Sequence, residues 1–581
     1  MIAFARTCAA IAATASKLEK VALVAAYLRE LDDADLAPAA RFFTGNPFAH
    51  ADERSLGLGW RTLVAAAHAA WGVEGTALSE AYRATGDLGA ALGPFVRPAV
   101  DLGLFRATLT PAILYGYLVE IAAAAGKSAQ KRRQVLCERV LGACTDPLEA
   151  TYVIKIVTGE LRIGLREGLI GDAVAQAFAA DPLAVRRAAS AAGDVGSVAV
   201  AAKRDALDEI EIAYHAPIAF MLATPIAYGS DYKDLAAGAW LVEDKYDGIR
   251  IQAHVTPGRV SLFSRTLNDV AASYPEVVAA LRELPGSFAL DGEIVAERDG
   301  RVLPFRYLQA RLQRKDVSPE LLAEVPVRYV VFDVLARDEQ FLLEEPLATR
   351  RAVLAQLFPA PPCHPERSRG TAAIVVAEWR SLDYARDDKG QETVHEYFAA
   401  ARERGNEGVI FKRSDAPYVP GRRGKWWLKL KRELATLDCV VVGVEWGHGR
   451  RSQVLSDYTF AVRGPHGLVP IGKAFSGLTD AEIAEMTAWF LAHRLPEPDA
   501  ALAYAALGLG RHEIVVEPTV VVEIAFDIIQ RSTLHASGFS LRFPRIVRLR
   551  PDKPAAEADT VAAVVDIYEQ MLARERVETN V

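Results

Sequence analysis

The chain has 581 residues, of which 51% are hydrophobic and 24% charged, and its formal net charge at pH 7 is −7. This length exceeds what one hydrophobic core serves, so we expect about three or four domains of ordinary globular composition. The negative balance argues against a uniformly basic protein that coats nucleic acid, although local basic stretches can still meet phosphates. Such stretches occur at residues 127–133, 422–425 and 542–550, with solvated surface as the alternative interpretation.

The five cysteines are widely spread, and none stands in a CxxC pair. Neither a disulfide framework nor a structural zinc site is therefore expected, and a reducing cytoplasm fits best. No run of about 18 apolar residues occurs, so we expect no transmembrane helix and no membrane partner. The alanine-rich residues 9–15 resemble a signal cleavage region, but no strongly apolar segment precedes them, so we interpret them as mature protein.

Residues 1–212 are rich in alanine and leucine, with apolar residues that recur at three and four positions. Leu18, Val21 and Val24 show this period, which is typical of amphipathic helices. We therefore expect an all-α N-terminal domain over residues 1–212. Prolines and a change from alanine-rich to mixed sequence at Tyr214–Pro225 mark its end.

The stretch Glu243–Arg250 sets a lysine among acidic residues, a glycine and an arginine. The residues before it, Ala239–Val242, are typical of a strand. A period of two would place Glu243, Lys245 and Asp247 on one side until the following glycine ends the ladder. A lysine attacks a phosphate only after its ordinary pKa of about 10.4 is lowered, which a nearby arginine or metal ion can do. The pattern suits nucleotidyl transfer, but on residue types alone a charged strand end with a turn at Asp247–Gly248 is the favoured interpretation.

Five further short strings follow in chain order, each with an ordinary charged strand as its alternative interpretation. β-branched and aromatic runs alternate here with helix-like residues 274–284 and 394–404. We therefore expect an α+β domain over residues 213–433. The five strings are Ser264–Arg265, Asp291–Val295, Tyr329–Leu335, Glu407–Lys412 and Trp427–Lys431.

Towards the C-terminus the sequence changes to short runs of β-branched residues. Residues 437–444, 458–462 and 520–524 are typical of strands in a small barrel, and residues 480–494 are helix-like. We expect a β-barrel domain of the OB-fold type over residues 434–581. This fold can bind nucleic acid, although many such domains serve only as packing modules.

In this order, the strings from Lys245 through Lys553 resemble those of the covalent nucleotidyltransferases, and specifically those of three-domain ATP-dependent DNA ligases. The resemblance implies a helical DNA-binding domain, a nucleotidyltransferase domain with ATP-grasp-like antiparallel sheets, and a C-terminal OB-fold. Residues 152–171 resemble a segment of the ligases' helical domain, which implies a grip on the minor groove around a nick. The implied partner is nicked double-stranded DNA, bound by a monomer.

The resemblance also implies three phosphoryl transfers, with ATP and Mg²⁺ as cofactors. Lys245 would attack the α-phosphate and expel pyrophosphate, the adenylate would pass to a DNA 5′-phosphate, and a 3′-hydroxyl would displace AMP. Glu293 and Glu407 match positions that hold the metal, and hard oxygen ligands suit Mg²⁺. The implied nucleotide contacts are Glu243 and Phe332 at the adenine, Glu293 at the ribose, Arg250 and Arg265 at phosphate or ribose, and Arg423, Lys429 and Lys431 at the α-phosphate.

Other segments resemble or depart from the family pattern. Arg550–Lys553 resembles the string that reaches the β- and γ-phosphates, which implies a hinge near Lys431–Leu437. Residues 363–370 and 380–390 depart from the pattern, and we interpret them as an insertion into a tolerant surface loop, without a function of its own.

Four alternatives remain. An RNA ligase or a GTP-dependent capping enzyme would share the lysine string but would not explain the helical domain. An NAD-dependent ligase is disfavoured because the expected cysteine cluster is absent from the sequence. A catalytically silent DNA-end scaffold would be expected to lose Lys245, Glu293 or Glu407, and all three are present. We therefore expect a cytoplasmic DNA ligase.

Overall fold

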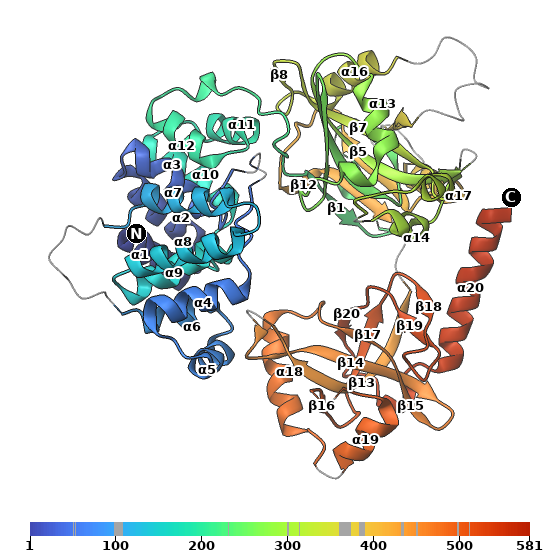
Figure 1. Cartoon of the computed structure of the whole chain (residues 1–581). Coiled ribbons are helices and arrows are strands. Elements are labelled where there is room, and N and C mark those ends of the chain that lie inside the picture. The colour runs from blue at the N-terminus through green and yellow to red at the C-terminus, as the bar shows by residue number, and fades with distance from the viewer. Residues whose placement is uncertain are drawn as a thin grey trace. The chain divides into compact units, whose positions relative to one another are not determined.

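The computed structural model describes residues 1–49, 52, 54–97, 108–230, 232–236, 238–298, 301–312, 314–359, 373–382, 390–431, 435–448, 451–496, 499–510 and 512–580 (Figure 1). The chain divides into two compact units, of which the second consists mainly of residues 433–581. The first half of the predicted insertion, residues 363–370, lies outside the described ranges. None of the helices in the described ranges is both long enough and apolar enough to cross a membrane.

The N-terminal region is helical, as its apolar period predicts. Thr110, Asp146 and Asp181 each accept hydrogen bonds at a helix N-terminus, and proline is the next residue in every case. Gly159 and Gly193 end helices in the left-handed conformation, at φ 72° and 59°. The helices are α1 (Ile2–Ala13), α2 (Lys17–Arg29), α3 (Asp33–Phe42), α4 (Trp60–Trp71), α5 (Gly75–Thr85), α6 (Leu88–Leu92), α7 (Pro111–Ala123), α8 (Ala129–Ala143), α9 (Pro147–Thr158), α10 (Glu167–Phe178), α11 (Pro182–Ala192) and α12 (Val195–Lys203).

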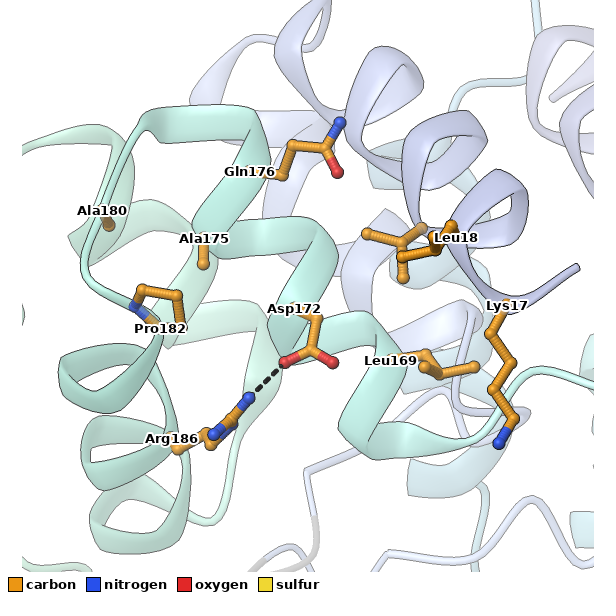
Figure 2. Close-up of a pocket in the computed structure, with 10 residues that line it drawn as sticks. Lys17, Leu18, Leu169, Asp172, Ala175, Gln176, Ala180, Pro182 and Arg186 are labelled. Carbon is orange, nitrogen blue, oxygen red and sulfur yellow. Dashed lines mark hydrogen bonds and ion pairs between the residues drawn. The ribbon is translucent and has the colours of Figure 1, made fainter.

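A surface hollow of about 410 Å³ lies in this helical region, lined by residues of α2, α10 and α11 (Figure 2). Asp172 and Arg186 form an ion pair of 2.8 Å in its lining. Leu18 also belongs to the lining, and it is 83% exposed. The lining residues do not include any of those predicted to contact the nucleotide.

The central region contains mainly strands. They are β1 (Leu222–Ile226), β2 (Trp240–Lys245), β3 (Ile249–Thr256), β4 (Arg259–Ser264), β5 (Phe288–Arg298), β6 (Arg301–Val302), β7 (Val327–Arg337), β8 (Gln340–Phe341), β9 (Ile374–Val376), β10 (Trp379–Leu382), β11 (Gly408–Arg413) and β12 (Arg423–Lys431). A seven-stranded sheet has the order β4-β3-β5-β7-β8, with β6 on β5 and β9 on β7, and a five-stranded sheet has the order β1-β12-β11-β2-β10. The sheets are mainly antiparallel, as expected, but β1 with β12 and β7 with β9 pair in parallel. A parallel pair needs a long connection, which the chain between these strands supplies.

The two sheets share a buried core. Val295 of β5, Phe332 of β7 and Trp427 of β12 belong to one hydrophobic cluster between them. Helices α13 (Pro275–Arg282) and α16 (Leu347–Leu357) pack on the seven-stranded sheet, and α17 (Gly390–Glu403) packs on the five-stranded sheet. The predicted helices near residues 274–284 and 394–404 are therefore confirmed as α13 and α17. Two shorter helices are α14 (Phe305–Leu308) and α15 (Pro319–Glu324).

The C-terminal unit contains the predicted strands and helix. A six-stranded sheet has the order β15-β14-β13-β17-β20 with β16 on β13, and β18 pairs with β19. Within the described residues this hydrogen-bonded path ends at β15 and β20, so the pairing gives a strand domain without the closed barrel that we expected. The elements are β13 (Thr436–Trp446), β14 (Leu455–Gly464), β15 (Gly467–Ala474), α18 (Asp480–Ala492), α19 (Asp499–Leu507), β16 (Ile514–Val515), β17 (Val521–Ala525), β18 (Ile529–Arg531), β19 (Phe539–Leu541), β20 (Arg545–Leu549) and α20 (Val561–Asn580).

Candidate active site

Three adjacent strands carry the predicted lysines. The pairing of β2, β11 and β12 places Lys245, Gly408 and Lys431 in one row across the sheet. The row two residues away contains Glu243 and Lys429. Because side chains alternate between the two faces of a strand, both rows project from the same face. The fold thus gathers the three lysines on one surface of the sheet.

The turn after β2 lies directly against β5. β2 ends at Lys245, so Asp247 belongs to the following bend and the expected strand alternation does not extend to it. A Cβ on Gly248 would lie 2.3 Å from the carbonyl oxygen of Ile294 and 2.9 Å from Cγ of Glu293. Glycine permits this approach because it has no side chain. The approach brings the predicted nucleophile next to Glu293.

Lys245 is paired with the predicted metal ligand Glu407. The Nζ of Lys245 lies 2.6 Å from Oε2 of Glu407, and the side chains are 19% and 33% exposed. The backbone N–H of Glu407 donates to the carbonyl oxygen of Lys245 at 2.8 Å, which fixes the two residues relative to each other. Both side chains therefore remain within reach of a ligand while they hold each other.

Glu293 is partly buried on β5 beside this pair. Burial raises the pKa of Glu293 to about 7; the charges of Glu407 and Asp291 add to this effect, whereas Lys245 and Arg250 oppose it. A carboxyl group with such a pKa loses its proton readily when a cation binds beside it.

The two carboxylates Glu293 and Glu407 offer the oxygen ligands that Mg²⁺ prefers. In the part of the chain that the structure describes, no group of three or more His, Cys, Asp or Glu residues could hold a metal ion. Mg²⁺ commonly binds through one or two carboxylates, with water and substrate phosphates in the other positions. The donor set therefore fits Mg²⁺ together with a phosphate-bearing ligand.

Arg250 makes its main contacts within the protein. Its Nε and Nη2 donate to the two carboxylate oxygens of Asp291 at 3.1 and 2.7 Å, and its Nη1 donates to the carbonyl oxygen of Met221 at 2.6 Å. The Arg250 side chain is 17% exposed. The structure shows Arg250 as the partner of Asp291, and its contact with phosphate or ribose stays a prediction.

The remaining predicted cations lie close enough to influence one another. The pKa of Lys429 is lowered, first by burial and then by the charges of Lys245, Lys431, Arg423 and Arg265. Arg265 and Arg423 are exposed, so the cationic group reaches the solvent. Such a concentration of positive charge attracts anions, and the triphosphate of a nucleotide is an anion of suitable charge.

Glu243 and Phe332, the predicted adenine contacts, are buried, with 3% and 8% of their surface exposed. Lys412 connects them, because its Nζ lies 2.7 Å from Oε2 of Glu243 and 4.0 Å from the centre of the Phe332 ring. Arg351 of α16 donates to the other carboxylate oxygen of Glu243. Neither cation is among the site residues predicted from the sequence. Strand alternation in β11 places Lys412 on the face of Glu243 and could have signalled it, whereas nothing local in α16 points to Arg351.

The segment of residues 152–171 contains the C-terminal part of α9, a loop and the start of α10. In the loop, Arg162 and Gly164 both have positive φ angles, of 54° and 64°. The Nζ of Lys20 donates to the carbonyl oxygens of Ile163 and Gly164 at 2.8 and 3.1 Å. A buried ammonium group therefore holds the loop that we predict to meet DNA.

The predicted C-terminal phosphate contacts are engaged within their own unit. Nη1 of Arg550 lies 2.8 Å and Nζ of Lys553 lies 2.7 Å from a carboxylate oxygen of Asp438. Residues 432–434 of the predicted hinge lie outside the described ranges.

Family models match three stretches of the chain: "DNA ligase N terminus" at residues 1–175, "ATP dependent DNA ligase domain" at 220–431 and "ATP dependent DNA ligase C terminal region" at 451–553. A probable DNA ligase of Koribacter versatilis is 44% identical over 573 residues, which cover 97% of this chain and 96% of that protein. A DNA ligase of Methanoculleus marisnigri is 34% identical over 568 residues, 97% of each chain. The solved structure Pmar-Lig_Pre aligns over 94% of this chain and 99% of its own with a TM-score of 0.54, and at 16% identity it shows the fold alone. By these relationships the chain belongs to the ATP-dependent DNA ligase family.

Proposed function

We propose that this chain is a DNA ligase that uses ATP and Mg²⁺ to seal nicks in double-stranded DNA through a covalent lysyl-AMP. The position of Lys245 carries the proposal. Its side chain shares one face of the sheet with Lys429 and Lys431, pairs with Glu407 at 2.6 Å and lies beside Glu293. Such a lysine is suited to attack a phosphate, because neighbouring cations attract the phosphate and neighbouring carboxylates can accept a proton or hold a metal ion.

In the first step, Nζ of Lys245 forms a bond to the α-phosphorus of ATP while the bond from that phosphorus to pyrophosphate breaks. Oε2 of Glu407 is 2.6 Å from Nζ and is placed to take the ammonium proton and pass it to water before the attack. Lys429 and Lys431 face the oxygens on which negative charge develops. Mg²⁺ held by Glu293 and Glu407 would supply further neutralisation of that charge.

The next steps transfer the adenylate away from the protein. The phosphorus–nitrogen bond of lysyl-AMP breaks as a DNA 5′-phosphate oxygen attacks, which returns the amine of Lys245. A DNA 3′-hydroxyl then attacks the activated phosphate and AMP leaves. The exposed cations Arg265 and Arg423 support this proposal because both remain accessible to a phosphate backbone.

Incubation with ATP labelled at the α-phosphate tests the first step. We expect one covalent AMP per chain in the presence of Mg²⁺ and its loss in Lys245→Ala. Lys203→Ala, which removes a lysine paired with Asp33 in the helical region, is the control and should label normally. Label that persists in Lys245→Ala would show that the nucleophile is misassigned.

Addition of nicked duplexes to the adenylated protein tests the later steps. We expect joining of a DNA nick and labelling from ATP in preference to GTP or NAD. Joining of RNA nicks alone would favour an RNA ligase, and labelling from GTP alone would favour a capping enzyme. Light scattering should give the mass of one chain for the free protein and the mass of one chain plus one duplex for its nick complex. Two chains per particle would contradict the expected monomer.

A further inference from the structure

Arg351 is a buried arginine whose guanidinium group is only partly used by the protein. It is 6% exposed, and its Nη2 donates to Oε1 of Glu243. Its Nε and Nη1 are buried and have no hydrogen-bond partner among the described residues. Unpaired N–H groups of a buried cation are rare, because water no longer satisfies them and nothing replaces it.

The neighbouring Arg350 shows what a structural arginine looks like on the same helix. Its Nε and Nη2 donate to the two carboxylate oxygens of Asp333 at 2.8 and 2.9 Å. Its Nη1 donates to the carbonyl oxygens of Glu345 and Ala416. Both carboxylate oxygens of Asp333 therefore accept hydrogen bonds from Arg350, and neither accepts one from Arg351.

Arg351 adjoins the proposed nucleotide site through its contact with Glu243. Arg351 contacts Glu243, which precedes Lys245 by two residues on the same face of β2, a spacing of about 6 to 7 Å along a strand. Lys412 occupies the second oxygen of Glu243 at 2.7 Å and lies over the ring of Phe332. Two cations thus share one carboxylate. The described residues supply no further acceptor for Nε and Nη1 of Arg351, and a bound ligand can provide one.

We propose that Arg351 reads the nucleobase by donating a hydrogen bond to a ring nitrogen of adenine, while the Glu243 that it holds accepts from the 6-amino group. N1 and N7 both flank that amino group and both are acceptors, so either atom can accept the hydrogen bond from Arg351. Guanine has an oxygen at position 6, which Glu243 would repel. This inference rests on the proposed function, because it assumes that the α-phosphate of ATP lies at Lys245.

Lysine adenylation with ATP, 1-deaza-ATP and 7-deaza-ATP tests the inference, since each analogue lacks one of the two acceptors. In the unsubstituted protein we expect one analogue to lower kcat/KM by about 10- to 100-fold, mainly through KM. Arg351→Met should show a similar loss with ATP and no further loss with that analogue. Where Arg351→Met does not fold, Arg351→Lys takes its place.

Arg350→Lys is the matched control, because Arg350 is buried on the same helix but fully paired. Arg350→Lys should lower the thermal stability and keep the full discrimination between ATP and the analogue. If Arg351 had a purely structural role, the Arg351 variants would keep that discrimination as well. Analogues that react like ATP, or an analogue loss of equal size in the unsubstituted protein and in the Arg351 variant, would overturn the inference. Absence of any label from ATP itself would instead refute the proposed function.

Discussion

Replacement of Gly248 by alanine tests how closely the turn that follows Lys245 must approach β5. The new Cβ would lie 2.3 Å from the carbonyl oxygen of Ile294, whereas real Cβ contacts are seldom below 3.4 Å. The turn and the strand must therefore separate by about 1 Å, and a misplacement of 1 Å in an active site lowers a rate by about 100-fold. Overpacking of this kind also lowers the free energy of unfolding by about 1 to 3 kcal/mol.

The assay for Gly248→Ala is the rate of Lys245 adenylation at saturating ATP and Mg²⁺, beside thermal unfolding. We expect a folded protein with a loss of about 100-fold in that rate. Gly116→Ala is the control, since a Cβ there meets no heavy atom within 4 Å and the residue lies inside α7. It should be neutral or stabilising, because alanine favours a helix over glycine. An unchanged adenylation rate in Gly248→Ala would refute the steric reasoning.

Further expectations concern a metal ligand, a buried histidine and the DNA-binding loop. Because the pKa of Glu293 lies near 7, Mg²⁺ must displace a proton from this carboxyl group below pH 7. The Mg²⁺ concentration for half-maximal adenylation should therefore be about tenfold higher at pH 6 than at pH 8. If the same pH dependence persists in Glu293→Gln, Glu293 is not its source. Burial lowers the pKa of His254 to about 3, and Nδ1 accepts from the backbone of His215. The unfolded chain therefore binds more protons below pH 6.5, and the free energy of unfolding should fall by about 1.4 kcal/mol per pH unit from 6.5 towards 3. Denaturant unfolding at several pH values should show a shallower fall in His254→Gln, and parallel curves would disprove the assignment. Lys20→Met removes the donor to two loop carbonyls, so the affinity of this variant for a nicked duplex should drop about tenfold while adenylation stays normal. Unaltered affinity in a binding titration would show that Lys20 has no part in DNA recognition.

Local sequence determined the helices and many of the strands, and it also supplied the prediction of the nucleophile. Thr110, Asp146 and Asp181 start helices through hydrogen bonds to residues two or three positions away, so a short window contains the whole signal. The same holds for the alternation that places Lys429 and Lys431 on one face of β12. Such features depend on neighbours in the chain, and for this reason they were predictable before any fold was known.

Only the tertiary structure decided which distant groups neutralise, bury and restrain the site. In the tertiary structure Arg250 pairs with Asp291, and both Arg351 and Lys412 pair with Glu243. The strands β1 and β12 also pair in parallel. Strand β2 also ends at Lys245, so Asp247 lies outside it. These outcomes arise from packing between segments far apart in sequence, where burial and charge pairing depend on the whole fold. Of these groups, Lys412 alone has a local signal, which is the strand alternation of β11.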